Sequence, residues 1–189
     1  MKKIRKGFTL IELLVVVSVL GSLAAMMSIA SGEAMTSAKA AKIINNLRNF
    51  AAAANEYYTD NMNRFYGADA TKNAPQITEI RYYMNEGSKT TSEPESLLTN
   101  YYVATEDVSD KSYAEVNWYV GYAFPEDGDI GAEESEAIKI KLAGRAKEIG
   151  LYGTDALEGG AAEVIEEVEF AKTHGVIWFK AREKSRRGS

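Results

Sequence analysis

The sequence predicts an α+β fold in which one long N-terminal helix packs on a small antiparallel β-sheet. Three observations predict it. No proline occurs before Pro75, the apolar residues change from a continuous run to a helical stripe near residue 30, and period-two alternation appears only in the C-terminal half. An amphipathic helix must bury its apolar stripe, and a sheet with one apolar face can cover it.

The long helix is expected from about Thr9 to Tyr58. Residues 8–30 are apolar apart from a few small polar side chains and one carboxylate, Glu12. As a helix, this segment would extend roughly 34 Å, which is enough to cross a bilayer core of about 30 Å. Residues 1–7 carry four basic side chains, so the positive-inside rule keeps this end in the cytoplasm and places the rest of the chain outside it.

Residues 31–65 continue the same helix with apolar residues at steps of three and four, and Gly32 is its one weak point. The expected stripe consists of Met35, Ile44, Leu47, Phe50 or Ala51, Ala54, Tyr57 or Tyr58, Met62 and Phe65. A stripe of this kind requires a globular partner, so residues 66–189 are expected to form an α+β head domain that lies against it.

Within the head, alternation predicts a strand over 113–124, with Val116, Trp118, Val120, Tyr122 and Phe124 on the inward face. Trp178 is also expected in the core. Other expected elements are short helices opened by Pro75 and Pro94, turns at 107–110 and 125–129, a helix over about 133–149, a loop at 153–160, and a hairpin of 167–172 with 176–182.

The composition of the chain argues against several classes of function. The chain has no cysteine, so disulfides and thiol chemistry are excluded. Its net charge is −5, and without residues 1–7 it retains 18 basic and 27 acidic side chains. This acidic balance argues against general nucleic-acid binding. The basic cluster at 180–187 is expected to be a solvated tail.

No motif calls for catalysis, and we expect a protein that is not an enzyme and has no cofactor. The single histidine, His174, lies in a predicted turn and has no cysteine or serine partner suggested by the sequence. The acidic residues from Glu126 to Glu134 do not have EF-hand spacing, and we interpret them as a turn and a helix start rather than a calcium site. In the tyrosine pairs 57–58, 82–83 and 101–102, one ring of each is expected in the core and the other at its rim.

Glu12 is the most informative residue, because a charge in a membrane-length apolar segment is costly and indicates a functional contact. It belongs to the run Lys6-Gly7-Phe8-Thr9-Leu10-Ile11-Glu12-Leu13-Leu14. This run, with Gly21 and the small residues that follow, resembles the N-terminus of type IV pilins and of the related pseudopilins of type II secretion.

The resemblance implies that a prepilin peptidase cuts between Gly7 and Phe8 and methylates the new amine of Phe8. It also implies a structural subunit that waits in the inner membrane and then joins an extracellular pilus through its N-terminal helix. Its partners would be copies of itself, minor pilins, the peptidase, an inner-membrane platform and an ATPase. We expect Glu12 to meet the Phe8 amine of a neighbouring subunit and so to set the register of assembly.

Three alternatives stay open. A pseudopilin in a periplasmic pseudopilus fits the same motif. The chain lacks both a proline at the end of the apolar run and a C-terminal cysteine pair, and these departures leave the branch of the family undecided. An ordinary secretory signal cleaved after Ala30, or an uncleaved single-span anchor carrying a binding domain, also fits the apolar run but gives Glu12 no role.

Overall fold

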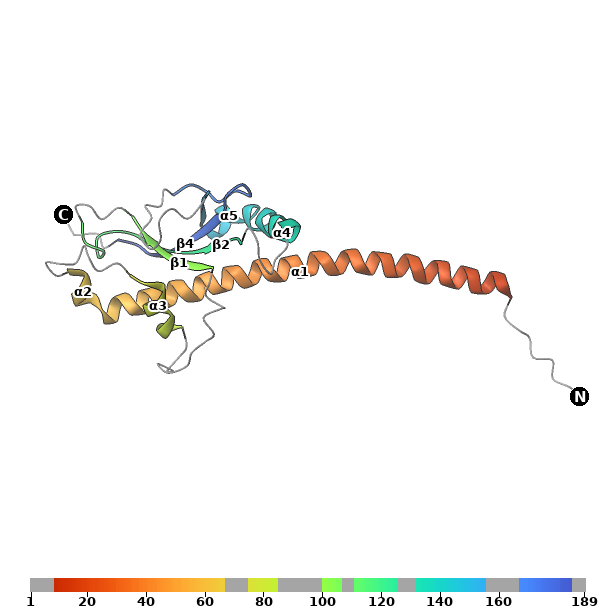
Figure 1. Cartoon of the computed structure of the whole chain (residues 1–189), viewed down its shortest axis with the longest axis horizontal. Coiled ribbons are helices and arrows are strands. Elements are labelled where there is room, and N and C mark those ends of the chain that lie inside the picture. The colour runs from red at the N-terminus through yellow and green to blue at the C-terminus, as the bar shows by residue number, and fades with distance from the viewer. Residues whose placement is uncertain are drawn as a thin grey trace, which may run out of the picture. The chain divides into compact units, whose positions relative to one another are not determined.

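The structure is a computed structural model that describes residues 9–66, 75–84, 100–106, 111–125, 132–155 and 167–184. The chain divides into two compact units, Met1–Ala38 and Lys39–Ser189. Helix α1 (Leu10–Asp60) contributes to both units and is labelled in Figure 1. Its bounds confirm the expected long helix, which continues through Gly21 and Gly32 because neither glycine alone outweighs the favourable neighbours.

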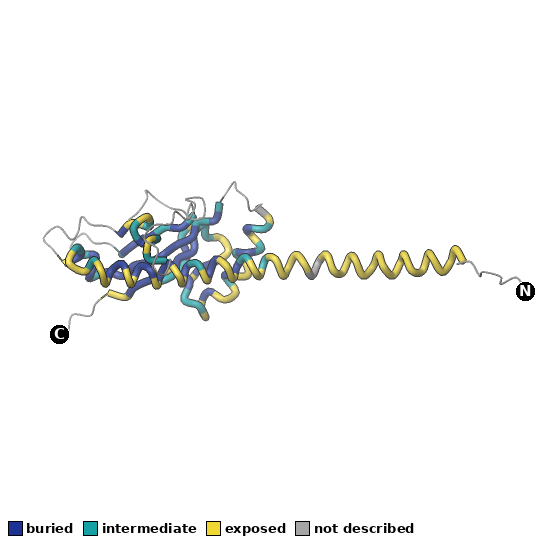
Figure 2. Tube along the Cα trace, turned by 90° about the horizontal axis from the view of Figure 1, so that it is seen from below, coloured by how far each residue is buried: buried dark blue, intermediate teal, exposed yellow. Residues whose placement is uncertain are grey.

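In the second unit, α1 buries one stripe of side chains, and the alternation of buried and exposed positions is visible in Figure 2. The buried stripe of α1 comprises Ala40, Ile43, Ile44, Leu47, Phe50, Ala51, Ala53, Ala54, Tyr57 and Tyr58. The prediction was wrong at Met35 and Met62, which are both exposed. Met35 precedes the second unit, and Met62 lies in helix α2 (Met62–Tyr66), whose buried residue is Phe65.

The sheet has four strands: β1 (Tyr101–Thr105), β2 (Trp118–Ala123), β3 (Leu151–Thr154) and β4 (Val176–Arg182). Their order is β1-β2-β4-β3, and every neighbouring pair is antiparallel. The α+β class, with the helix on a small antiparallel sheet, is therefore confirmed. Strands β1 and β3 were not predicted, and β2 is shorter than the expected 113–124 because residues 113–116 form turns and bends.

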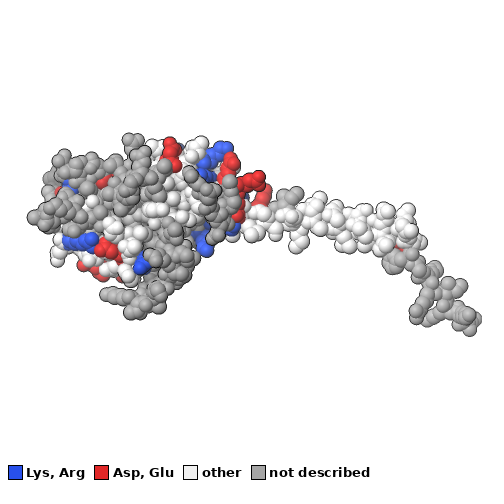
Figure 3. Space-filling view, viewed as in Figure 1, with Lys and Arg blue, Asp and Glu red and all other residues white. Residues whose placement is uncertain are grey.

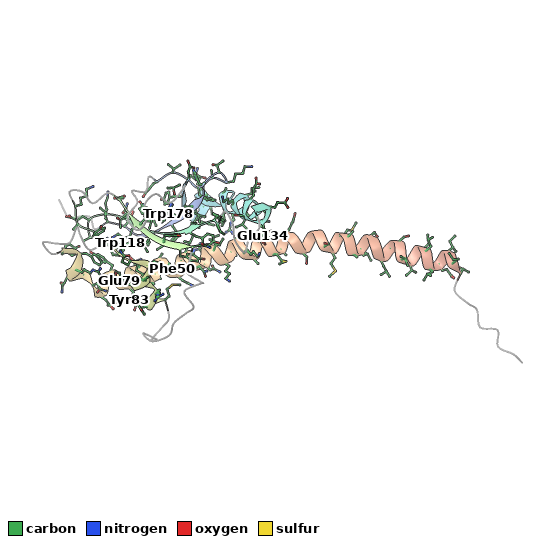
Figure 4. The ribbon with its side chains drawn as sticks, in the orientation of Figure 1. Phe50, Glu79, Tyr83, Trp118, Glu134 and Trp178 are labelled. Atoms are coloured by element: carbon green, nitrogen blue, oxygen red, sulfur yellow. The ribbon has the colours of Figure 1, made fainter. Side chains whose placement is uncertain are left out.

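Both faces of the sheet are apolar. The expected inward residues Trp118, Val120 and Tyr122 join the main core with α1, where the Trp118 and Tyr58 rings lie 5.4 Å apart. A second, smaller cluster on the sheet consists of Ala104, Tyr119, Val176 and Trp178. Both tryptophans, labelled in Figure 4, are buried as predicted, but in different clusters, and they belong to the paired strands β2 and β4.

The predicted hairpin of 167–172 with 176–182 was wrong. Strand β4 pairs instead with β2 and β3, and Glu169 makes an isolated bridge with Tyr152 of β3. The segment expected as a loop from 153 therefore begins inside a strand. The residue pattern of a short segment such as 167–172 does not show whether it is a strand, because that depends on the strand with which it can pair.

The remaining helices differ in detail from expectation. The helix expected over 133–149 is divided into α4 (Ala132–Ala143) and α5 (Ala146–Ile149), and α5 ends at Gly150 with a φ of 77° that glycine adopts without strain. Helix α3 (Ile77–Ile80) has Gln76 as its N-cap, so Pro75 precedes the cap instead of occupying the first turn; the 3-10 helix η2 (Arg81–Tyr83) follows. The predictions at Pro94, 107–110 and 126–129 lie outside the described residues.

Candidate functional site

The carboxylate of Glu12 closes the first turn of α1 on Thr9. Its Oε2 accepts hydrogen bonds from the Thr9 backbone N–H at 2.9 Å and from the Thr9 hydroxyl at 2.8 Å. In return, the Glu12 N–H donates to Thr9 Oγ1 at 3.3 Å. This reciprocal arrangement is a capping box, which satisfies backbone donors that a helix start otherwise leaves open.

The capping box gives Thr9 a role that the sequence analysis missed. The signal was present, because Thr followed three residues later by Glu and then by an apolar run is a typical helix start. Gly7 and Phe8 lie outside the described residues. The structure thus brings Glu12 together with Thr9 and leaves the predicted contact of Glu12 with a neighbouring Phe8 as a prediction.

Beyond Glu12, the first half of α1 exposes an apolar surface on all sides. Leu13, Val17, Leu20 and Leu23 are each more than half exposed, and Figure 3 shows this part of the helix as an uncharged surface. Its hydroxyls are satisfied within the helix, since Ser18 donates to Leu14 O at 2.8 Å and Ser22 to Val19 O at 2.9 Å. Internal satisfaction of polar groups is what a hydrocarbon environment demands.

Within the described part of the chain, α1 alone has the length and composition to cross a membrane, with a mean hydropathy of 2.4 over its most apolar window of 18 residues. None of that window is buried inside the structure. Such a surface in water would favour association, so it must be covered by lipid or by protein.

In the second unit, charged groups serve the packing of the head. The Arg64 guanidinium lies 2.8 Å from Glu79 Oε1, and the Tyr57 hydroxyl donates to Glu79 Oε2 at 2.8 Å. Burial opposes the ionised form of Glu79, but these hydrogen bonds prevail and lower its pKa. Burial and the hydrogen bond to Tyr66 raise the pKa of Tyr58 to about 12. These shifts follow from structural contacts and do not converge on a reaction centre.

Two predictions about aromatic and basic residues need correction. Tyr57 and Tyr58 are both buried, because α1 is covered on two sides there, by β2 and by α3 with η2. Arg182, expected in a solvated tail, is buried and donates to Ala114 O at 3.1 Å. The pairs 82–83 and 101–102 fit the expectation better, since Tyr82 is exposed and Tyr101 is buried.

Other candidate ligands are engaged in a hydrogen bond or an ion pair within the head. His174 lies beside the turn at 172–173, close to the predicted turn, and its Nδ1 accepts a hydrogen bond from the Ala171 N–H at 3.0 Å. Glu134 of α4 forms an ion pair with Lys39 of α1. The described residues contain no group of three potential metal ligands, and most of the acidic turn considered for calcium lies outside them.

Residues 2–28 match the prokaryotic N-terminal methylation motif. This motif marks type IV pilins and type II secretion pseudopilins. The N-terminal segment of the chain therefore carries the motif of these proteins. Neither the search of curated proteins nor that of solved structures found a match.

The fold agrees with this motif, because a long N-terminal helix on a four-stranded antiparallel sheet is a pilin-like arrangement. Pilin-family proteins are typically structural and not enzymatic. The apolar first half of α1 and the motif together point to a membrane-inserted precursor that later enters a pilus or pseudopilus. The family also implies processing by a prepilin peptidase and polymerisation.

Proposed function

We propose that this chain is the structural subunit of a type IV pilus-like filament. The observation that carries the proposal is the uncovered apolar half of α1, which begins with a capped carboxylate and has internally satisfied hydroxyls. Lipid can cover this surface before assembly. After extraction from the membrane, only other helices of the same kind can cover it, so the segment serves first as an anchor and then as a filament core.

Processing prepares this helix for assembly. Residues 1–7 form the leader, the peptidase cuts between Gly7 and Phe8, and the new amine of Phe8 is methylated. Residues 8–30 form the membrane and filament-core segment, residues 31–65 the amphipathic continuation, and residues 66–189 the head. The boundary between the compact units, at Ala38 and Lys39, supports a change of environment along the helix after residue 30.

Glu12 is the residue proposed to set the assembly register. Both bonds from Thr9 go to Oε2, and no described residue donates to Oε1. The capping box thus occupies one oxygen only, which supports the proposal that the other accepts the Phe8 amine of a neighbouring subunit. Such a pair would neutralise two charges in an apolar setting, and its main effect would be on register.

The assembly route follows from this function. The precursor waits in the inner membrane with its head outside the cytoplasm. A peptidase, a platform protein and a cytoplasmic ATPase act on it, and the product is a polymer of this chain.

Mass spectrometry of the mature protein tests the processing step. We expect a methylated Phe8 at the N-terminus. A mature protein that starts at Ser31 would indicate a secretory signal, and an intact Met1 would indicate an uncleaved anchor. Either result would contradict the proposal.

Imaging of cells with this one gene deleted tests the filament type. Loss of surface filaments would support the assignment of this chain as a pilus subunit. A secretion defect in cells that keep their surface filaments would instead identify the chain as a pseudopilin, with its polymer confined to the periplasm.

A further inference from the structure

We infer that His174 is a proton-sensitive switch that holds the segment 167–174 on the outer edge of β3. The inference rests on the way in which the imidazole is bonded. Its Nδ1 accepts a hydrogen bond from the Ala171 N–H at 3.0 Å, and the His174 N–H donates to Ala171 O at 3.1 Å. These two bonds close the turn that leads into β4. The first of them exists only while Nδ1 carries no proton.

The turn ends a segment that lies along the outer edge of β3. The Gly153 N–H donates to Val168 O at 2.9 Å, and the Phe170 N–H donates to Leu151 O at 3.0 Å. An isolated bridge lies between these two bonds, and the other edge of β3 pairs with β4. The segment therefore covers backbone groups that would otherwise stand unpaired at the edge of the sheet.

The imidazole is also in close contact with β3 itself. A Cβ on Gly153 would lie only 2.0 Å from the His174 Nδ1, so the ring occupies the space that a side chain at Gly153 would need. The Phe170 ring adds a second contact, with the two ring centroids 5.9 Å apart. These contacts hold the ring in the position in which Nδ1 meets the Ala171 N–H.

Protonation of the imidazole removes this acceptor. The neutral ring has one N–H and one acceptor nitrogen, and the bond from Ala171 assigns the proton to Nε2. A histidine side chain gains its second proton between about pH 8 and pH 5. The new Nδ1–H would face the Ala171 N–H, so two donors would meet and the turn would have to open. An open turn releases Val168 and Phe170 from β3 and leaves the edge of the sheet unpaired.

A carboxylate bonded to the imidazole would stabilise its protonated form in the closed turn. Among the residues that the structure describes, none forms an ion pair with His174. Lys172 of the turn lies 3.7 Å from Glu136 of α4 instead. The titratable and charged groups of the elements around the imidazole are Tyr152 and Asp155 in and after β3, Glu167, Glu169 and Lys172 in the segment, and Glu136 and Lys139 on α4.

Hydrogen exchange of the full chain in detergent, followed by mass spectrometry, tests the switch. After correction for the intrinsic pH dependence of exchange, protection of peptides that cover 167–175 should fall about five- to tenfold between about pH 8 and pH 5.5. Peptides within β2 should keep their protection, because this strand is paired on both edges by other strands. Equal protection of 167–175 at the two pH values would overturn the inference.

Two variants separate His174 from the other titratable groups. In His174→Asn, the side-chain oxygen can accept the Ala171 N–H in place of Nδ1 but does not titrate, so the segment should stay protected at both pH values. In His174→Phe, a ring remains but the acceptor is lost, so protection should be low at both. If His174→Asn keeps the pH dependence of the wild type, another group controls the segment and the inference is wrong.

A measurement on the wild-type chain does not depend on the folding of any variant. Nitrogen-15 NMR of the imidazole should show the Nε2–H tautomer in alkaline solution, and the signals belong to one residue because the chain has a single histidine. An Nδ1–H tautomer would overturn the inference. The switch is a property of the folded head, so its failure would leave the proposed filament function in place, and a chain that never polymerises could still show it.

Discussion

The guanidinium carbon of Arg182 lies 3.6 Å from the centroid of the Tyr58 ring. This contact joins the last strand of the sheet to the C-terminal part of α1. Arg182 also donates to the backbone carbonyls of Val116 and Ala114, at 3.4 and 3.1 Å. Burial lowers the pKa of Arg182, yet the Tyr58 ring and two carbonyls compensate the buried charge.

We therefore expect Arg182→Ala to lower the free energy of unfolding by about 2 kcal/mol, since it removes the ring contact and leaves two carbonyls without their donor. This free energy is measured by urea unfolding of the detergent-solubilised chain, with near-UV circular dichroism as the probe. Lys184→Ala is the control, because the backbone N–H of Lys184 donates to Asn117 Oδ1 at 2.8 Å and this bond survives the substitution. Equal stability of the two variants would contradict a packing role for Arg182.

Gly121 lies on β2 where a side chain would collide with Trp178. A Cβ at this position would come within 2.3 Å of two carbon atoms of the Trp178 ring, which is fully buried. Gly121→Ala should thus destabilise the head by about 1–3 kcal/mol. Gly144→Ala is the matched control, because its Cβ would meet backbone oxygens only at 3.6 and 3.8 Å. Thermal unfolding of both variants measures the difference in stability. A Gly121→Ala protein as stable as the wild type would show that Trp178 can move aside.

These two positions also show where the sequence was informative. The long helix and β2 were predictable because both carry strong periodic patterns. Strands β1 and β3 were not, since β1 is buried on both faces and shows no alternation, and β3 contains Gly153. Their partners in the sheet make them strands. Arg182 was placed in a tail because charge clusters are usually solvated, and only the position of Tyr58 in space reveals its ring contact.

At the N-terminus the sequence predicted Glu12 from the cost of a charge in an apolar segment. It did not predict Thr9 as a partner, although Thr9 and Glu12 have the spacing of a capping box. A local pattern of four residues is readable from sequence. A contact with another subunit is not, since its geometry depends on the assembly.

Acid should weaken the head through Glu167. The hydrogen bond from Lys180 lowers the pKa of Glu167, and the Tyr119 hydroxyl donates to the same carboxylate at 2.8 Å. A lowered folded-state pKa means that this contribution is complete above the unfolded value near 4.5 and is lost as pH falls below it. Glu167→Gln should thus reduce stability at pH 7 and flatten the decline between about pH 5 and 3.

Thermal unfolding across this pH range, for the wild type and Glu167→Gln, measures the effect. Glu169→Gln serves as a control on the same segment, because Glu169 forms no ion pair with another described residue. If the two variants show the same pH dependence, the contact of Glu167 with Lys180 does not contribute to acid sensitivity.

Thr9 should affect assembly through the capping box. Thr9→Val removes the hydroxyl that donates to Glu12 Oε2 and accepts from the Glu12 N–H, which should destabilise the helix start by about 1 kcal/mol. Thr9→Ser keeps both bonds. We expect lower filament yield from Thr9→Val, near-normal yield from Thr9→Ser, and unchanged leader cleavage in both, measured by shearing filaments from cells and by mass spectrometry. Normal assembly of Thr9→Val would show that the cap is dispensable.

Substitution of Glu12 should block filament assembly without preventing membrane insertion. Glu12→Ala and Glu12→Val remove the one charge from residues 8–30, so membrane insertion should persist while assembly is blocked, because the carboxylate would no longer receive the Phe8 amine of a neighbour. Glu12→Gln is the sharper variant, since an amide oxygen can still accept the Thr9 N–H but carries no charge. Loss of filaments in Glu12→Gln, with processed subunit retained in the membrane, would assign the defect to charge and not to the cap. Filament yield equal to wild type in Glu12→Ala would refute the pairing, and the apolar surface of α1 would then have to set the register without it.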